Sequence, residues 1–172
     1  AVFLQTEDNR DVGETCHLTP RQMIKALLER DDPRPVVVKP HPKERTPETL
    51  DWLVRQAKKD PRLQIFLGNI HDLLAKADVV VTINSAVGIE AMLHEKPVVL
   101  CGDTDFHHIC DMVRKRREMD AAIARAEGRA AAGQVPFRAY IGWYYGCMCH
   151  DPRAPDFGAR VVAKLRAMGL PG

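Results

Sequence analysis

Five short apolar segments, separated by stretches with helical spacing, constrain the fold of this chain more than any other feature. They are rich in β-branched residues and lie at 2–5, 35–39, 63–67, 78–83 and 97–101. Apolar strands that alternate with helices are typical of a parallel sheet covered on both faces. The sequence therefore predicts an α/β fold with a Rossmann-like parallel sheet of about five strands.

Helix-start signals fall between the apolar segments. Residues that suit the N-cap are Thr19 (followed by Pro20), Thr46 (followed by Pro47), Asn69, Ser85 and Asp156. Side chains of this kind accept a hydrogen bond from the first helical turn, and Pro is favoured at the first helical position. We expect helices to begin at these five places.

The alternation stops after residue 102. A charged, alanine-rich helical stretch follows, then an aromatic-rich segment and an expected helix at 157–168. We predict a Rossmann-like core at 1–110 and a helical or irregular extension at 111–172, packed on the same domain. Because a strand stands at the first residue, we expect a domain taken from a longer protein.

Composition narrows the class of partner. A net charge of +2 is too mild to indicate nucleic acid. Apolar runs fall short of the roughly 20 residues that span a bilayer. The five cysteines are an odd number and Cys101 lies in an apolar segment, which favours a reducing compartment over a disulfide framework.

Two apolar segments end abruptly in polar and small residues. The segment at 35–39 ends on Lys39, and His41 follows between two prolines that fix the backbone around it. The segment at 78–83 ends on Asn84 and Ser85. Ligands of open parallel sheets bind outside the carboxyl ends of the strands. We therefore expect these two ends to frame a ligand site.

The residues after Ser85 extend this interpretation. With Ser85 as N-cap, the amides of 86–88 would face the crevice and bind phosphate, and Gly88 would allow a close approach. Glu90 would accept hydrogen bonds from ribose hydroxyls, by analogy with dinucleotide folds. The set predicts a nucleotide, although a structural turn at His41, a structural cap at Ser85 and an exposed helix position at Glu90 remain open.

These segments resemble the capsular polysaccharide biosynthesis family, whose members include bacterial Kdo transferases. The matching residues are Gln5, Asp8, Lys39, Pro40, His41, Pro42, Asn84, Ser85, Gly88, Glu90, Ala91, Lys96, Pro97, Val98, Gly102 and Phe106. The resemblance covers about residues 2–108. Glu95 departs from the glycine usual in that family, and Met92 from leucine.

The resemblance implies the C-terminal, nucleotide-binding half of a GT-B glycosyltransferase. His41 and Lys39 would be catalytic. The nucleotide-binding residues would be Asn84, Ser85, Gly88, Glu90 and His41, with CMP phosphate on His41 and Ser85 and ribose on Glu90. An acceptor hydroxyl would displace CMP from a Kdo-like sugar acid, and donors aimed at the leaving phosphate would stabilise its charge without a metal or cofactor.

The resemblance also implies partners and a location. These are a nucleotide sugar, a glycan or glycolipid acceptor, no nucleic acid, and the N-terminal half of the same enzyme, which would supply the general base. From the sequence itself, an acidic loop with Glu7, Asp8 and Asp11 could face the same crevice, although a merely solvated loop is the favoured interpretation. The chain alone would bind nucleotide without turnover, in the bacterial cytoplasm, with peripheral association at the inner face of the membrane.

Three alternatives remain open. A polyol-phosphate transferase or a UDP-sugar enzyme such as an epimerase would keep the fold and change the nucleotide. A zinc module would use Cys147, Cys149 and His150, or the cluster His107, His108 and Cys110, although neither has repeated C-x-x-C spacing. A scaffold with a degenerate site is the third.

Overall fold

A computed structural model describes residues 1–5, 15–43 and 47–170 and contains a parallel six-stranded sheet. The strands are β1 (Val2–Phe3), β2 (Val36–Lys39), β3 (Leu63–Ile65), β4 (Val80–Thr82), β5 (Val98–Leu100) and β6 (Asp111–Met112). Their order is β3-β2-β1-β4-β5-β6, and each neighbouring pair is parallel. The predicted α/β class is confirmed, with β6 as an addition.

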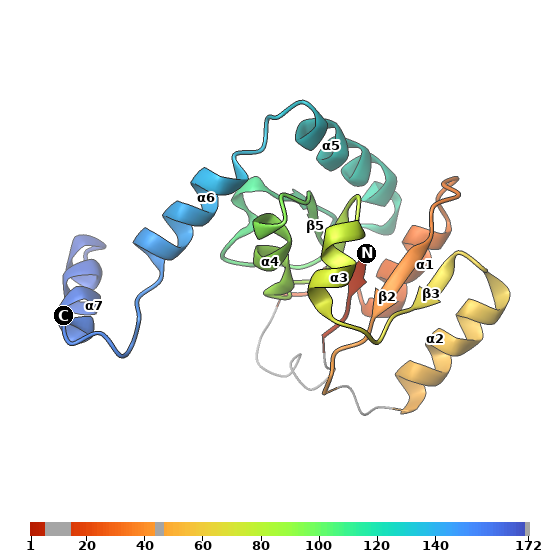
Figure 1. Ribbon diagram of the computed structural model, residues 1–172, viewed down its shortest axis with the longest axis horizontal. Helices are drawn as coiled ribbons and strands as arrows, with labels where there is room; N and C mark the ends of the chain where they lie inside the picture. Colours follow the sequence, from red (N-terminus) through yellow and green to blue (C-terminus); the bar gives the residue numbers. More distant parts are fainter. Residues whose placement is uncertain (6–14, 44–46, 171–172) are drawn as a thin grey trace. The chain divides into compact units, whose positions relative to one another are not determined.

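Helices cover both faces of this sheet. The strand residues Val38, Val81 and Val99 share one buried core with α1 (Pro20–Leu28), α2 (Pro47–Lys59) and α5 (Met119–Ala131). The opposite face carries α3 (Ile70–Lys76) and α4 (Val87–Leu93), which lie side by side in Figure 1. Because side chains alternate along a strand, successive residues point to opposite faces of the sheet. They therefore pack against the two helix layers alternately.

Local signals explain where most helices begin. Thr19 and Gln22 form a reciprocal capping box at the start of α1, and the Asn69 side chain accepts from the His71 amide at the start of α3. Both caps were predicted. Thr46 lies outside the described residues.

Of the other two predicted caps, Ser85 was wrong in position, and Asp156 was correct in position but makes no capping hydrogen bond. Helix α4 begins at Val87, so Ala86 holds the N-cap position, and Ser85 accepts from the Val87 amide at 3.3 Å one residue earlier. Asp156 is the N-cap residue of α7 (Phe157–Ala167), as predicted, but its carboxylate accepts from the Arg160 Nε and not from the first helical turn.

The chain divides into two compact units, Ala1–Phe137 and Arg138–Gly172. The first unit holds the sheet and helices α1 to α5, including β6 and α5, which come after residue 110. The second contains most of α6 (Phe137–Trp143), a π-helix at Tyr144–Met148 and α7. Within it, Tyr140 stacks on Tyr144, and Lys164 donates to the carbonyls of Cys147 and Met148.

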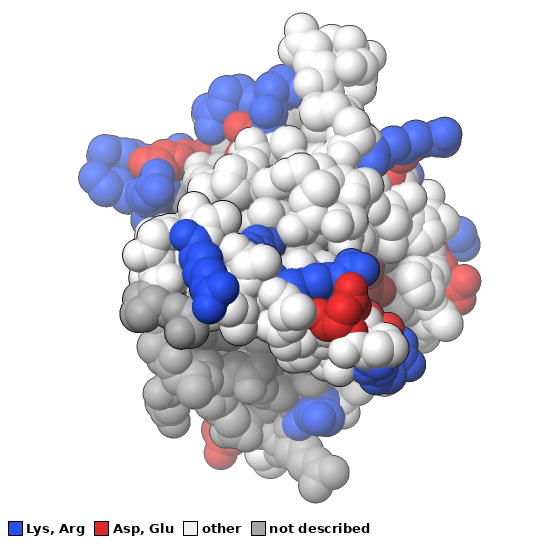
Figure 2. Space-filling model, turned by 90° about the vertical axis from the view of Figure 1, so that its left-hand side faces the viewer, with Lys and Arg blue, Asp and Glu red and all other residues white. Residues whose placement is uncertain are grey.

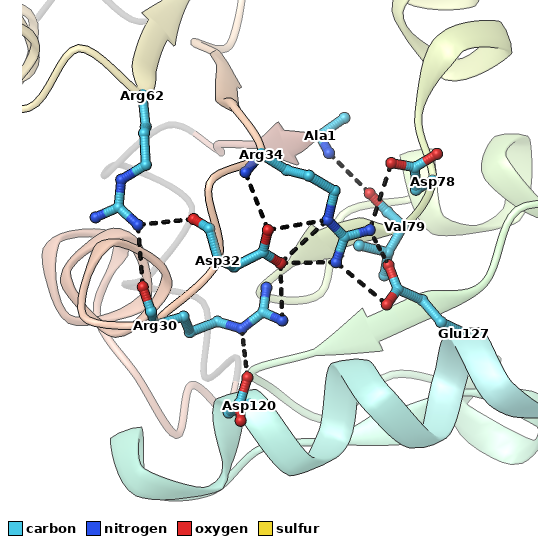
Figure 3. A network of polar contacts seen from close by, with 9 residues as sticks. All are labelled: Ala1, Arg30, Asp32, Arg34, Arg62, Asp78, Val79, Asp120 and Glu127. Atoms are coloured by element: carbon cyan, nitrogen blue, oxygen red, sulfur yellow. Dashed lines mark hydrogen bonds and ion pairs between the residues drawn. The ribbon is translucent and has the colours of Figure 1, made fainter.

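A polar network braces the amino-terminal edge of the sheet (Figure 3). Arg34, just before β2, donates to Asp32 at 2.7 Å and to Glu127 of α5 at 2.6 Å. Arg62, before β3, donates to the carbonyls of Arg30 and Asp32. The network joins α5 to the loops that enter two strands.

Candidate functional site

The strand register brings the two predicted site segments to one level. Phe3 of β1 pairs with Lys39 on one side and with Thr82 on the other. Gln5, His41 and Asn84 each follow one of these paired residues by two positions. All three therefore lie at the same level, just beyond the carboxyl ends of their strands. Because neighbouring strands lie about 4.8 Å apart, β2 and β4 are about 10 Å apart across β1.

The same place is the topological switch point of the sheet. The strand order runs β1, β2, β3 in one direction and β4, β5, β6 in the other, so the reversal lies between β1 and β4. Ligands of open α/β sheets bind outside the carboxyl ends of the strands at such a reversal. The predicted residues thus flank the position at which this topology favours a ligand.

His41 presents one ring nitrogen for a ligand. Its Nδ1 lies 3.1 Å from the Lys43 amide, which must donate. A neutral ring that accepts at Nδ1 carries its proton at Nε2. The partly exposed His41 therefore offers an Nε2–H donor, as a phosphate oxygen requires.

Lys39 is held on the other side of β2. Its Nζ donates to the Gly68 carbonyl at 2.6 Å and lies 5.8 Å from the centre of the Phe66 ring. Both contacts belong to the segment between β3 and α3. The ammonium group keeps two further protons, but its position here ties a loop, and its catalytic role stays a prediction.

Two backbone amides at the start of α4 already donate to Ser85. The Val87 amide donates to the Ser85 hydroxyl, and the Gly88 amide donates to the Ser85 carbonyl at 2.9 Å. The expectation that both amides face the crevice without partners is therefore wrong. Ser85 itself is partly exposed, and its hydroxyl can still donate a proton to a ligand.

Gly88 makes room for an aromatic ring. A Cβ at this position would lie 2.6 Å from Cε2 of Phe106, which is buried in the segment after β5. The close approach that the sequence suggested for Gly88 is thus an approach by Phe106. Its predicted contact with nucleotide remains untested.

Glu90 lies in the first turn of α4, and its side chain is 37% exposed. Its Oε2 is 3.9 Å from Nε2 of His71 in α3. The partial exposure leaves the carboxylate able to accept from a ligand hydroxyl.

Sequence reasoning missed a histidine–aspartate pair at the same edge. His17 Nε2 lies 2.9 Å from Asp103 Oδ1, and the His17 side chain is 17% exposed. The pair forms because Cys16 and Gly102 make an antiparallel bridge after β1 and β5. The two residues are 86 positions apart and belong to no motif, so nothing in the sequence linked them.

The zinc alternative gains no geometric support. Among residues 1–5, 15–43 and 47–170, no group of three or more His, Cys, Asp or Glu side chains could hold a metal ion. Burial raises the pKa of the Cys110 thiol to about 12, and that thiol donates to the Phe106 carbonyl. In the protein without a metal, this thiol is therefore protonated. His107 lies 2.6 Å from the Thr104 carbonyl and stacks on His108.

A cavity of about 360 Å³ lies at the opposite edge of the sheet, not at the predicted site. The starts of β1, β2 and β4 line it, together with α3. Its charged rim residues Arg30, Asp32, Arg34 and Asp78 already bind one another. Asp72 and Lys76 also line the cavity. The ligand site at the carboxyl edge stays a prediction.

The predicted acidic residues Glu7, Asp8 and Asp11 lie outside the described residues. In the part of the chain that is described, no helix is long and apolar enough to cross a membrane. Figure 2 shows Lys and Arg side chains on one face, where uncharged surface and acidic residues separate them. Exclusion of nucleic acid as a partner stays a prediction.

Residues 1–126 match the family model described as capsule polysaccharide biosynthesis protein. A 68-residue segment is 44% identical to protein FixF of Sinorhizobium fredii, covering 37% of this chain and 17% of that protein. The chain therefore spans a small part of this relative.

Two solved structures are similar in fold. UDP-GlcNAc 2-epimerase from Methanocaldococcus jannaschii is 15% identical with a TM-score of 0.59, covering 96% of this chain and 45% of the epimerase. Alr3699/HepE of Anabaena, in complex with UDP-glucose, is 16% identical with a TM-score of 0.50, covering 86% of this chain and 48% of HepE. The chain spans about half the length of these structures.

Proposed function

Because this chain belongs to the capsule polysaccharide biosynthesis family, we propose that it is the nucleotide-sugar-binding half of a glycosyltransferase that builds capsular or surface polysaccharide. One observation carries the proposal. The register places His41 and Asn84 level on either side of β1, at the switch point of the sheet. The spacing of about 10 Å suits a nucleotide lying across β1.

In this proposal the donor is a CMP-activated sugar acid. The phosphate binds the His41 Nε2–H and the Ser85 hydroxyl, with Asn84 and Gly88 beside it, and Glu90 accepts from the ribose hydroxyls. Lys39 adds positive charge. The acceptor oxygen forms a bond to the anomeric carbon as the bond from that carbon to phosphate breaks, and the electron pair leaves with CMP. Donors already aimed at the phosphate stabilise that charge without a metal or cofactor.

The rest of the enzyme supplies what this chain lacks. We propose that an N-terminal half contributes the general base and binds a glycan or glycolipid acceptor. The enzyme would work in the cytoplasm, with peripheral attachment at the inner face of the membrane. The chain alone would bind nucleotide without turnover.

A UDP-sugar enzyme is the second candidate. The observation that favours it is the fold shared with a UDP-GlcNAc 2-epimerase and with HepE bound to UDP-glucose. Fold similarity at 15–16% identity leaves the nucleotide open. A polyol-phosphate transferase, with a CDP-linked donor, is the corresponding third case.

Calorimetric titration of this chain with CMP, CDP, UDP and GDP tests the proposal. We expect selective binding of CMP, weakened at least tenfold by His41→Ala and unchanged by His150→Ala, a histidine of the second unit. Selective binding of UDP or CDP would favour the second or third candidate. No binding of any nucleotide would contradict the proposed function.

A further inference from the structure

Two histidines outside the proposed site residues contact each other, and one of them, His71, also faces the Glu90 carboxylate. His71 comes from the first turn of α3, and His94 is the C-cap of α4. The His71 Nδ1 and His94 Nε2 atoms are 3.1 Å apart, and the rings stack with centroids 5.3 Å apart. The second nitrogen of His71, Nε2, lies 3.9 Å from Glu90 Oε2.

When the rings are neutral, one proton arrangement satisfies these contacts best. An ionised carboxylate can only accept, so the His71 Nε2 that faces it carries a proton. The neutral His71 ring then has a lone pair at Nδ1, and His94 must donate its Nε2–H to it. If His71 is instead protonated on both nitrogens, its Nε2–H still faces Glu90. In the neutral state, acceptance of the His94 Nε2–H by His71 Nδ1 keeps the His71 proton on Nε2. In the doubly protonated state, His71 Nδ1–H donates to His94 Nε2 instead.

The distance to Glu90 defines the strength of this contact. The 3.9 Å between His71 Nε2 and Glu90 Oε2 is too long for a hydrogen bond, so the contact is an electrostatic attraction. Contacts of this kind commonly shorten when a ligand binds. A carboxylate held through one oxygen keeps the other to accept from a hydroxyl.

We propose that His71, oriented by His94, is a positioning residue that holds the Glu90 carboxylate for the ribose hydroxyls of the nucleotide. The inference rests on the proposed function and deepens it. Without His71 the Glu90 side chain would have to be ordered by the ligand, and that ordering would cost affinity. His71 itself need not touch the nucleotide.

The first test uses the tightest binder among CMP, CDP, UDP and GDP, together with its 2′,3′-dideoxy form. We expect His71→Ala to weaken binding of the ribonucleotide by about 3- to 10-fold, the range of one modest polar contact. The same change should leave binding of the dideoxy form unaltered, because that ligand lacks the hydroxyls. His71→Gln, whose amide can donate where Nε2–H does, should restore most of the affinity.

A double-mutant cycle separates positioning from general damage to the fold. The loss from His71→Ala should nearly vanish in a Glu90→Gln background, because coupled residues are not additive. Nitrogen NMR of the imidazole rings provides an independent readout. We expect the His71 proton on Nε2 in the free protein, and a mixture of tautomers in His94→Ala.

The outcomes that overturn the inference are distinct from those that overturn the function. Nucleotide binding that His41→Ala weakens but His71→Ala leaves unchanged would refute the positioning role alone. So would equal losses for the ribonucleotide and its dideoxy form, additive losses in the cycle, or a neutral His71 ring whose single proton lies on Nδ1. Absence of binding to all four nucleotides in the unmodified chain would remove the proposed function and this inference together.

Discussion

Glu95 adopts a left-handed backbone conformation, with φ of 55°, directly after the C-cap of α4. Its amide donates to the Met92 carbonyl and the Lys96 amide donates to the Ala91 carbonyl, which is the Schellman pattern. This position favours glycine, because the Cβ of any other residue costs about 1–2 kcal/mol in the left-handed region. The glycine that the family usually carries before Lys96 therefore has a conformational reason.

We predict that Glu95→Gly stabilises the protein by about 1 kcal/mol, because relief of the left-handed strain exceeds the entropy that glycine loses on folding. For a domain of this size the melting temperature should rise by about 2–4 °C. Glu95→Ala is the matched control, since it removes the carboxylate but keeps the Cβ. An equal gain from Glu95→Ala would show that strain is not the cause.

Gly88 gives the opposite expectation. The Phe106 ring occupies the space that a Cβ at Gly88 would need. Gly88→Ala should therefore force that ring to move and destabilise the protein by about 1–3 kcal/mol. Urea unfolding measures the change. Phe106→Leu should relieve part of the clash in the double variant.

Gly128→Ala in α5, where a Cβ meets open space, should instead stabilise the protein by up to about 1 kcal/mol.

At the scale of elements, Arg34 joins the segment before β2 to α5. Hydrogen bonds from Arg34 hold the pKa of the Asp32 carboxyl well below its usual range. A carboxyl whose folded pKa is depressed stabilises the fold above its unfolded pKa, near 4, and this stabilisation is lost as the pH falls toward the folded pKa. The Arg34 side chain is 40% exposed, so solvent screens the pair.

We predict that Arg34→Met lowers the free energy of unfolding by about 1–2 kcal/mol at pH 7. The difference in the free energy of unfolding between the variant and the unmodified protein should narrow at pH 3. At that pH the unmodified protein also loses part of the stabilisation that the ionised Asp32 provides. Urea unfolding at both pH values measures this. Arg55→Met, on an exposed position of α2, should change little at either pH. A constant difference for Arg34→Met would mean that packing, and not the ion pair, is responsible.

The elements that the sequence predicted are those with local signals. Apolar segments predict five strands correctly, and Thr19, Pro47, Asn69 and Asp156 predict four helix starts correctly. Strand β6 has only two residues and begins with Asp111, whose burial depends on Arg125 and Arg129 of α5. No local pattern contains that partnership.

The same limit applies to the candidate site. His41 and Asn84 could be placed together because the carboxyl ends of parallel strands meet at one edge. The pairs His17–Asp103 and His71–Glu90 could not, because loop pairing and the packing of α3 beside α4 bring them together. The N-cap of α4 was misplaced by one residue because Ser85, a good N-cap, instead accepts from Val87 just before the helix.

At the scale of the whole molecule, the sheet separates stability from binding. The Arg34 network lies at the amino edge, and the proposed nucleotide residues lie at the carboxyl edge. Arg34→Met should therefore lower stability while leaving nucleotide affinity within about twofold, because the changed residue and the ligand share no partner. A calorimetric titration well below the melting temperature checks this, and a tenfold loss of affinity would contradict the separation.

The first compact unit contains every strand of the sheet and both of its buried faces. No residue of α7 is buried, so this helix contributes no core of its own. We therefore predict that a chain ending at Phe137 unfolds cooperatively, with a melting temperature within about 2 °C of the full chain, a difference of less than about 1 kcal/mol. Nucleotide titration of the shortened chain should give the same affinity, since the residues proposed to bind it lie between His41 and Glu90. A shortened chain that unfolds gradually, or that folds but loses the nucleotide, would show that residues 138–172 complete the core or the site.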